Sequence, residues 1–112
     1  MNDMPAPENK SVTPLRDKIE EVLRTVYDPE IPVNILELGL VYDIQIGDGG
    51  HVKIRMTLTA PACPAAGEII FDVQQKVEAL DEVKDCHVEL TFDPPWTKDM
   101  MTEEAKLELG ML

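Results

Sequence analysis

The sequence of 112 residues is poor in positive charge, aromatic residues and cysteine. Ten Lys and Arg stand against 22 Asp and Glu, so the net charge is −12 at pH 7 and the protein repels the phosphates of nucleic acids. Two cysteines are too few for a disulfide framework, and in a reducing compartment both are thiols. Because aromatic residues make up only 4% of the chain, aliphatic side chains must form most of the core. These shortages argue against nucleic-acid binding and against a disulfide-stabilised domain.

Long apolar runs are also absent. Charged residues, prolines and glycines interrupt every apolar stretch well before the roughly 18 residues that a membrane-spanning helix needs. Residues 1–10 carry neither the apolar segment of a signal peptide nor the basic amphipathic pattern of a transit peptide. We therefore expect a soluble cytoplasmic protein that makes no contact with membranes.

The length and the hydrophobic content of 44% fit one compact domain. Residues 1–12 are polar, contain prolines and lack periodicity, which predicts a flexible N-terminal tail before a single domain over 13–112. The first helix is expected to begin at Thr13-Pro14, a capping residue followed by proline at the first helical position. It ends before two prolines force the chain at 28–32 into an extended loop. Its apolar face comprises Leu15, Ile19, Val22, Leu23 and Val26.

Three later segments alternate apolar and polar residues, which predicts strands with one buried face. Their apolar positions are Leu40, Tyr42, Ile44 and Ile46, then Val52, Ile54, Met56 and Leu58, then Cys86, Val88, Leu90 and Phe92. The polar positions between them, Thr57 included, are expected on the opposite, exposed face. Residues 47–50 contain three glycines and predict a tight hairpin between the first two strands.

A second helix is predicted over 64–80, between the second and third strands, because apolar residues recur there at helical spacing. A third helix is expected from Thr97 to Leu109, ending near Gly110. One polar sheet face and two amphipathic helices favour packing of both helices on the apolar face. The predicted fold class is α/β (α+β), a two-layer sandwich with a three-stranded mixed sheet, helices on one face and the order α-β-β-α-β-α.

Cys63 is the strongest candidate for chemistry. It lies between Thr59 and Pro64, in the loop that leaves the second strand and enters the second helix. Free N–H groups and the positive end of the helix dipole lower the pKa of a thiol there, which makes the sulfur a better nucleophile or metal ligand. The alternative is a buried cysteine that caps the helix for packing reasons.

The other cysteine and the two histidines are weaker candidates. Cys86 occupies an apolar strand position and is expected to be an inert core residue. A zinc site built from both cysteines, His51 and His87 lacks paired ligand spacing, and Cys86 and His87 must point to opposite faces. We expect His51 to be a solvated loop residue and His87 to make a cross-strand hydrogen bond.

Asp28 and Glu30 are two residues apart on an extended segment and can project to the same side. Such a carboxylate pair could act in acid–base chemistry or bind a hard metal. On chemistry alone we favour the other interpretation, in which the acids make local backbone hydrogen bonds in an Asp-Pro-Glu turn.

Trp96, Met100 and Met101 follow a double proline near the C-terminus. Exposed aromatic and methionine side chains often form docking patches for partner proteins. The alternative is that they close the open end of the core.

Several of these motifs together resemble the MIP18 (DUF59) family. The strings are Asp28–Asn34 (DPEIPVN), Leu38–Tyr42 (LGLVY), Met56–Pro64 around Cys63, and Phe92–Trp96 (FDPPW). Within that family the chain resembles the SufT-type iron–sulfur assembly proteins of bacteria. The resemblance covers about residues 13–110.

The resemblance implies a non-enzymatic carrier or adaptor of the SUF system that delivers iron–sulfur clusters to target proteins or directs them there. It places the family's reactive cysteine at Cys63 and its acidic loop at Asp28 and Glu30, with Thr59 and Pro64 in support. The implied partners are the assembly machinery and apo iron–sulfur proteins. Because a cluster normally takes four ligands and one chain offers one suitable thiolate, we expect no stably bound cofactor. A transient iron or cluster would share its other ligands with a small thiol, a partner or a second copy in a homodimer.

Two alternative functions stay open. The family also includes an accessory protein of the phenylacetyl-CoA oxygenase complex, whose longer form has extra C-terminal cysteines that are absent up to Leu112. A thiol-dependent enzyme using Cys63 would need a nearby base or a resolving thiol, and neither is evident in the sequence.

Overall fold

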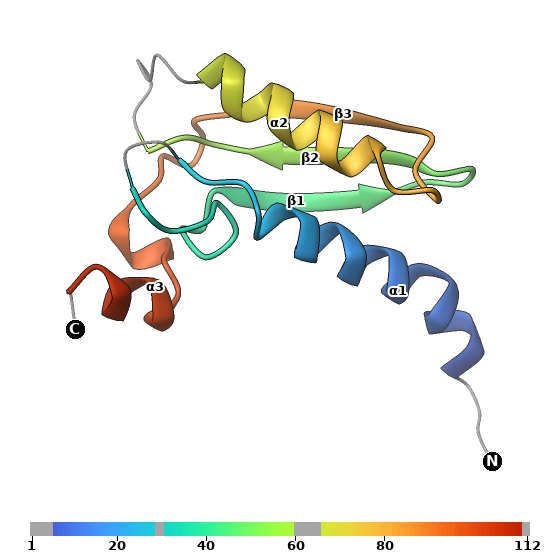
Figure 1. Cartoon of the computed structure of the whole chain (residues 1–112), viewed down its shortest axis with the longest axis horizontal. Coiled ribbons are helices and arrows are strands. Elements are labelled where there is room, and N and C mark those ends of the chain that lie inside the picture. Colours follow the sequence, from blue (N-terminus) through green and yellow to red (C-terminus); the bar gives the residue numbers. More distant parts are fainter. Residues whose placement is uncertain (1–5, 29–30, 60–65, 111–112) are drawn as a thin grey trace.

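The computed structural model describes residues 6–28, 31–59 and 66–110. The elements in chain order are α1 (Ala6–Leu23), β1 (Val41–Ile46), β2 (His51–Met56), α2 (Ala66–Glu78), β3 (Asp85–Leu90), the 3₁₀ helix η1 (Lys98–Met100) and α3 (Glu103–Glu108). Within these ranges the sheet has three strands in the order β1-β2-β3 (Figure 1). β1 and β2 are antiparallel, whereas β2 and β3 are parallel. The predicted mixed sheet and element order are confirmed.

The core lies between the sheet and two helices, α1 and α2. Both helices contribute buried apolar residues at the spacing predicted from the sequence. The cluster they form with the strands includes Leu15, Ile19, Leu23, Ile69, Val73, Val77, Ile44, Val52, Ile54 and Met56. One continuous core of this kind requires both helices on the same face of the sheet, as expected. No helix in the described ranges is long and apolar enough to cross a membrane.

The start of α1 differs from the prediction. The helix begins at Ala6, inside the stretch predicted as a flexible tail, and Pro14 lies in its interior. Proline removes one intrahelical hydrogen bond, but a single missing bond does not end a helix whose later turns pack on a core. Pro7 is tolerated because N–H groups of the first turn lack helical partners anyway. The predicted start at Thr13-Pro14 is therefore wrong, and residues 1–5 lie outside the described ranges.

β1 contains an irregularity that alternation could not predict. Val41 pairs with Met56 and Asp43 with Arg55, so the intervening Tyr42 is an extra residue opposite one partner position. The ring of Tyr42 lies 6.0 Å from the guanidinium carbon of Arg55 and is half-buried, not part of the core. The prediction that Tyr42 joins the buried face is wrong because the bulge interrupts the period of two.

At the ends of two strands the burial of side chains also differs from the prediction. Thr57 was expected on the exposed face but is completely buried, and the alternation of buried and exposed residues stops there, since Leu58 is buried as well. Leu90 and Phe92 were expected in the core but are 36% and 37% exposed. β3 forms an edge of the sheet, so side chains at its end have neighbours on one side only.

The C-terminal helix predicted as one element is two short ones, η1 and α3. Thr102 separates them with extended backbone, and its hydroxyl accepts a hydrogen bond from the N–H of Ala105. The N–H of Thr102 donates to the carbonyl of Glu37 at 3.0 Å, outside the helix. This tertiary bond explains the break. The helix ends before Gly110, which has a φ of +76°, as the sequence predicts.

Candidate functional site

Four segments meet at one end of the molecule. The carboxyl ends of the parallel strands β2 and β3 lie there, beside the N-terminal end of α2 and the segment that follows α1 (Figure 1). In open α/β sheets this end commonly binds ligands, because loops and helix N-termini converge on it. The segments that carry the predicted residues Asp28 and Thr59 are therefore at the same end of the sheet.

Asp28 is a buried acid within a folded loop. Its side chain belongs to a residue only 3% exposed, in contrast to the solvated acid of an ordinary turn. Tyr27 and Asn34 form an antiparallel bridge that closes the loop, and the N–H of Ile31 donates to the carbonyl of Asp28 at 3.2 Å. Burying a carboxylate is unfavourable unless polar groups surround it, so this position is strongly specified by the fold.

The remaining predicted site residues lie at the edges of the described ranges or outside them. Thr59 is half-buried beyond β2, and α2 begins at Ala66. Cys63, Pro64 and Glu30 lie outside the described residues. The thiol at the start of the helix and the pairing of Glu30 with Asp28 stay predictions.

Cys86 is a buried core residue, as predicted. It is 5% exposed, and its N–H donates to a carboxylate oxygen of Glu78 at 3.0 Å. Burial, helped by the nearby carboxylates of Glu78 and Asp85, raises the pKa of the Cys86 thiol to about 11. A thiol with this pKa is protonated at neutral pH and is a poor nucleophile and a poor metal ligand.

The histidines lie on neighbouring strands. His51 is the first residue of β2, not a loop residue as predicted, and its Nδ1 lies 2.8 Å from a carboxylate oxygen of Asp85. His87 is exposed on β3, and its expected cross-strand hydrogen bond stays a prediction. In the described part of the chain, no group of three or more His, Cys, Asp and Glu residues could hold a metal ion.

The three C-terminal candidates pack against the rest of the chain. The indole N–H of Trp96 donates to the carbonyl of Leu38 at 2.6 Å, and Met101 is buried in the core. The sulfur of Met100 lies 3.5 Å from the hydroxyl oxygen of Tyr42. These contacts fit the interpretation that the segment closes the core, and Met101 has almost no surface to offer a partner. Docking through Trp96 and Met100 stays a prediction.

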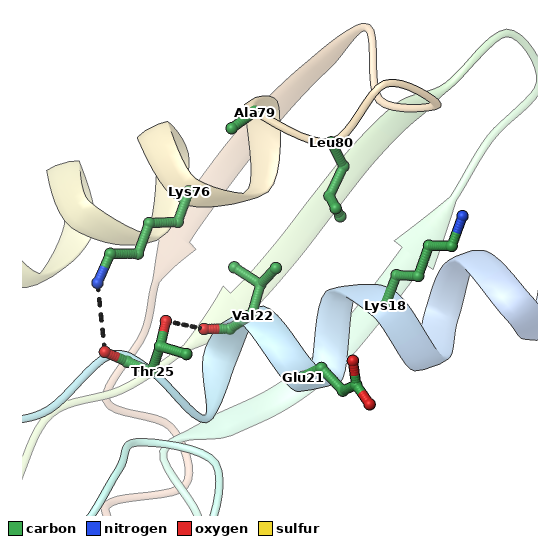
Figure 2. Close-up of a pocket in the computed structure, with 7 residues that line it drawn as sticks. All are labelled: Lys18, Glu21, Val22, Thr25, Lys76, Ala79 and Leu80. Carbon is green, nitrogen blue, oxygen red and sulfur yellow. Dashed lines mark hydrogen bonds between the residues drawn. The ribbon is translucent and has the colours of Figure 1, made fainter.

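A groove of about 470 Å³ between α1 and α2 contains none of the predicted site residues. Figure 2 shows Val22 and Leu80 pointing into it from the two sides, while Lys76 reaches toward Thr25. The ammonium of Lys76 donates to the carbonyl of Thr25 at 3.2 Å, and that of Lys18 is paired at 2.6 Å with a carboxylate in the loop after α2. The lysines of this groove are thus used to join neighbouring elements.

Two exposed rings that no sequence motif indicates lie beside the loop. Tyr27 and Phe71 are 53% and 58% exposed. They line a hollow of about 320 Å³ together with Glu68, Ile69 and Asp72. The sequence signal for Phe71 is its position on its helix, which lies outside the apolar face that packs on the core.

Several known proteins are similar to this chain in sequence and in fold. The profile of a family described as "Iron-sulfur cluster assembly protein" matches residues 16–90. A Porphyromonas gingivalis protein named "Fe-S protein maturation auxiliary factor" is 55% identical over 104 residues, covering 93% of this chain and 99% of its own. A Staphylococcus aureus protein, "Fe-S protein maturation auxiliary factor SufT", is 42% identical over 86 residues, covering 77% of this chain and 98% of its own. The crystal structure of a DUF59 domain from Bacillus anthracis has a TM-score of 0.84 at 38% identity, covering 93% of this chain and 99% of that one.

Proposed function

The chain belongs to the iron–sulfur cluster assembly protein family, and on this premise we propose that it is a maturation factor that delivers or directs clusters to apo proteins. The observation that carries the proposal is the similarity to the Porphyromonas gingivalis maturation factor at 55% identity over 99% of that protein. Because the alignment spans nearly the whole relative, the function of the relative resides in the part that the two chains share. The proposed partners are the assembly machinery and apo iron–sulfur proteins of the cytoplasm.

We propose that Cys63 is the thiolate that holds iron or a cluster in transit. Of the two cysteines in the chain, Cys86 is buried and protonated at neutral pH, which leaves Cys63 for this role. A cluster normally takes four ligands, so the donor, the recipient, a small thiol or a second copy must supply the others. Shared ligation suits a carrier, because ligands can be exchanged one at a time as the cargo moves. The iron or cluster is cargo here and not a resident cofactor.

Asp28 supports this role through its position. The buried acid and its closed loop lie at the same end of the sheet as Thr59 and the start of α2, the two ends that flank Cys63 in the chain. We propose that the folded loop fixes the surroundings of the thiol. The role is non-enzymatic, since the proposed step is a ligand exchange at the metal.

The test uses cells whose only copy of this protein carries Cys63→Ser, with Cys86→Ala as the matched control. We measure the activity and abundance of an iron–sulfur enzyme such as aconitase, and the abundance of the variant. The expected result is a fall in enzyme activity with Cys63→Ser and none with Cys86→Ala, at equal abundance of every protein. Normal activity with Cys63→Ser would overturn the role of the thiol and leave the loop of Asp28 and the Trp96 segment as candidates.

A further inference from the structure

The hollow lined by Tyr27 and Phe71, here called the aromatic hollow, combines apolar walls with negative charge. The buried Ile69 and the two acids Glu68 and Asp72 complete its lining. Both titratable side chains of this lining besides Tyr27 are thus carboxylates. Exposed aromatic rings in a protein with few aromatics are unfavourable in water, which is why such residues often mark a binding surface.

The chemistry of this lining selects a cation. Aromatic ring faces attract ammonium and guanidinium groups, and the adjoining carboxylates attract the same groups by charge. The ammonium of Lys76 lies 3.2 Å from the carboxylate of Asp72. The carboxylate of Glu68, in the first turn of α2, is therefore the one more open to an incoming cation. The chain already uses such a contact elsewhere, because the guanidinium of Arg55 lies over the ring of Tyr42.

We propose that the aromatic hollow binds an arginine or lysine side chain of the client polypeptide. Arginine fits better, because its planar guanidinium stacks on rings and is weakly hydrated. The net charge of −12 favours a basic partner segment over an acidic one.

The aromatic hollow lies beside the segments that form the proposed site. Tyr27 directly precedes the buried Asp28, and Glu68 and Phe71 belong to the first half of α2. A client segment held here is brought to the end of the sheet where the loops of the proposed site begin. The identification of the partner as a client rests on the proposed function, whereas binding of a basic side chain does not.

The experiment is a titration of the full-length ¹⁵N-labelled protein with the peptide acetyl-Leu-Arg-Leu-amide, followed by NMR amide shifts. A matched peptide carries citrulline, which has the shape of arginine without its charge. We expect shifts at residues 27 and 68–72 with the arginine peptide and much weaker binding of the citrulline peptide. Phe71→Leu keeps an apolar side chain and removes the ring, and it should weaken arginine binding about two- to fivefold.

The control variant is Leu107→Ala, which removes an exposed hydrophobic side chain from α3, and it should bind like the parent protein. Equal binding of the citrulline peptide, or unchanged arginine binding by Phe71→Leu, would overturn the proposal. Shifts spread over the whole acidic surface would overturn it as well, because they indicate attraction by net charge alone. The titration needs no cluster, so its failure is distinguishable from a failure of the Cys63→Ser test.

Discussion

Burial gives Cys86 a chemistry opposite to the one proposed for Cys63. Its thiol is buried in the core, and the carboxylates of Glu78 and Asp85 act on it electrostatically. Low polarity and negative neighbours both oppose formation of a thiolate, so the pKa rises to about 11. A cysteine at a helix N-terminus experiences the reverse, since N–H groups and the dipole stabilise negative charge.

The raised pKa of Cys86 predicts a loss of stability in alkali. Below the unfolded-state value of 9.0, the thiol is protonated in both states and this contribution is fully present. Between 9.0 and about 11 only the unfolded chain releases the proton, so the free energy of unfolding falls by about 1.4 kcal/mol per pH unit from this group. Urea unfolding at several pH values measures the effect, and Cys86→Ala should lack it. An identical pH dependence of the two proteins would contradict the assignment.

Residue patterns predicted the central strand well and the edges poorly. Val52, Ile54 and Met56 are all buried as alternation requires, because β2 has a neighbouring strand on each side. Tyr42 and Leu90 lie on edge strands, where a bulge and a missing neighbour override the period of two. The sequence identified Asp28 as a candidate, but its burial depends on the closure of its loop by an antiparallel bridge, which neither helical spacing nor alternation encodes. Phe71 could not be recognised from helical spacing, because it lies off the apolar face of its helix.

At the scale of elements, the C-terminal segment is held against the turn that precedes β1. The indole of Trp96 donates to Leu38, and the N–H of Thr102 donates to Glu37. Between these bonds Gly39 has a φ of +81°, and a Cβ at this glycine would lie 2.3 Å from the carbonyl oxygen of Met100. The two segments approach this closely only because residue 39 has no side chain.

We predict that Gly39→Ala destabilises the protein by about 2–4 kcal/mol, because strain from positive φ adds to a backbone clash. Gly67→Ala is the matched control, since Gly67 lies in α2 and an added Cβ would meet no atom within 4 Å beyond its chain neighbours and the backbone of its own helix. Alanine at this position in the first turn of α2 should change the stability by less than about 1 kcal/mol. Chemical denaturation of both variants measures the difference. A cost below about 1 kcal/mol for Gly39→Ala would show that the C-terminal segment moves aside freely.

The identity and order of the elements followed from sequence, but some boundaries did not. Helical spacing and alternation are local signals, and they located the three strands and α2. The break at Thr102 depends on its bond to Glu37, which is distant in the sequence, so the segment from Thr97 onward was predicted as one helix. Pro14 predicts a helix start because proline favours that position, but packing of Leu15 and Ile19 allows the helix to continue through it.

At the scale of the whole molecule, negative charge opposes compactness. The chain carries a net charge of −12 within extents of 46 × 30 × 23 Å. At about 0.01 M salt the Debye length of about 30 Å is comparable to the molecule, so most of its charges repel one another. At about 0.1 M the length falls to about 10 Å and only close neighbours interact. Salt should therefore act on folding and on binding in opposite directions.

We predict that adding sodium chloride from about 0.01 to 0.15 M raises the Tm of the protein, because screening relieves self-repulsion in the folded state. The same addition should weaken binding of the arginine peptide, since screening also reduces its attraction to the carboxylates of the aromatic hollow. Calorimetry and the NMR titration measure the two effects. Sodium perchlorate is the control, because in this range screening depends on ionic strength and not on the anion. If the Tm falls with either salt, or if the salts differ, specific ion effects dominate; tighter peptide binding at higher salt would mean that apolar contacts alone hold the peptide.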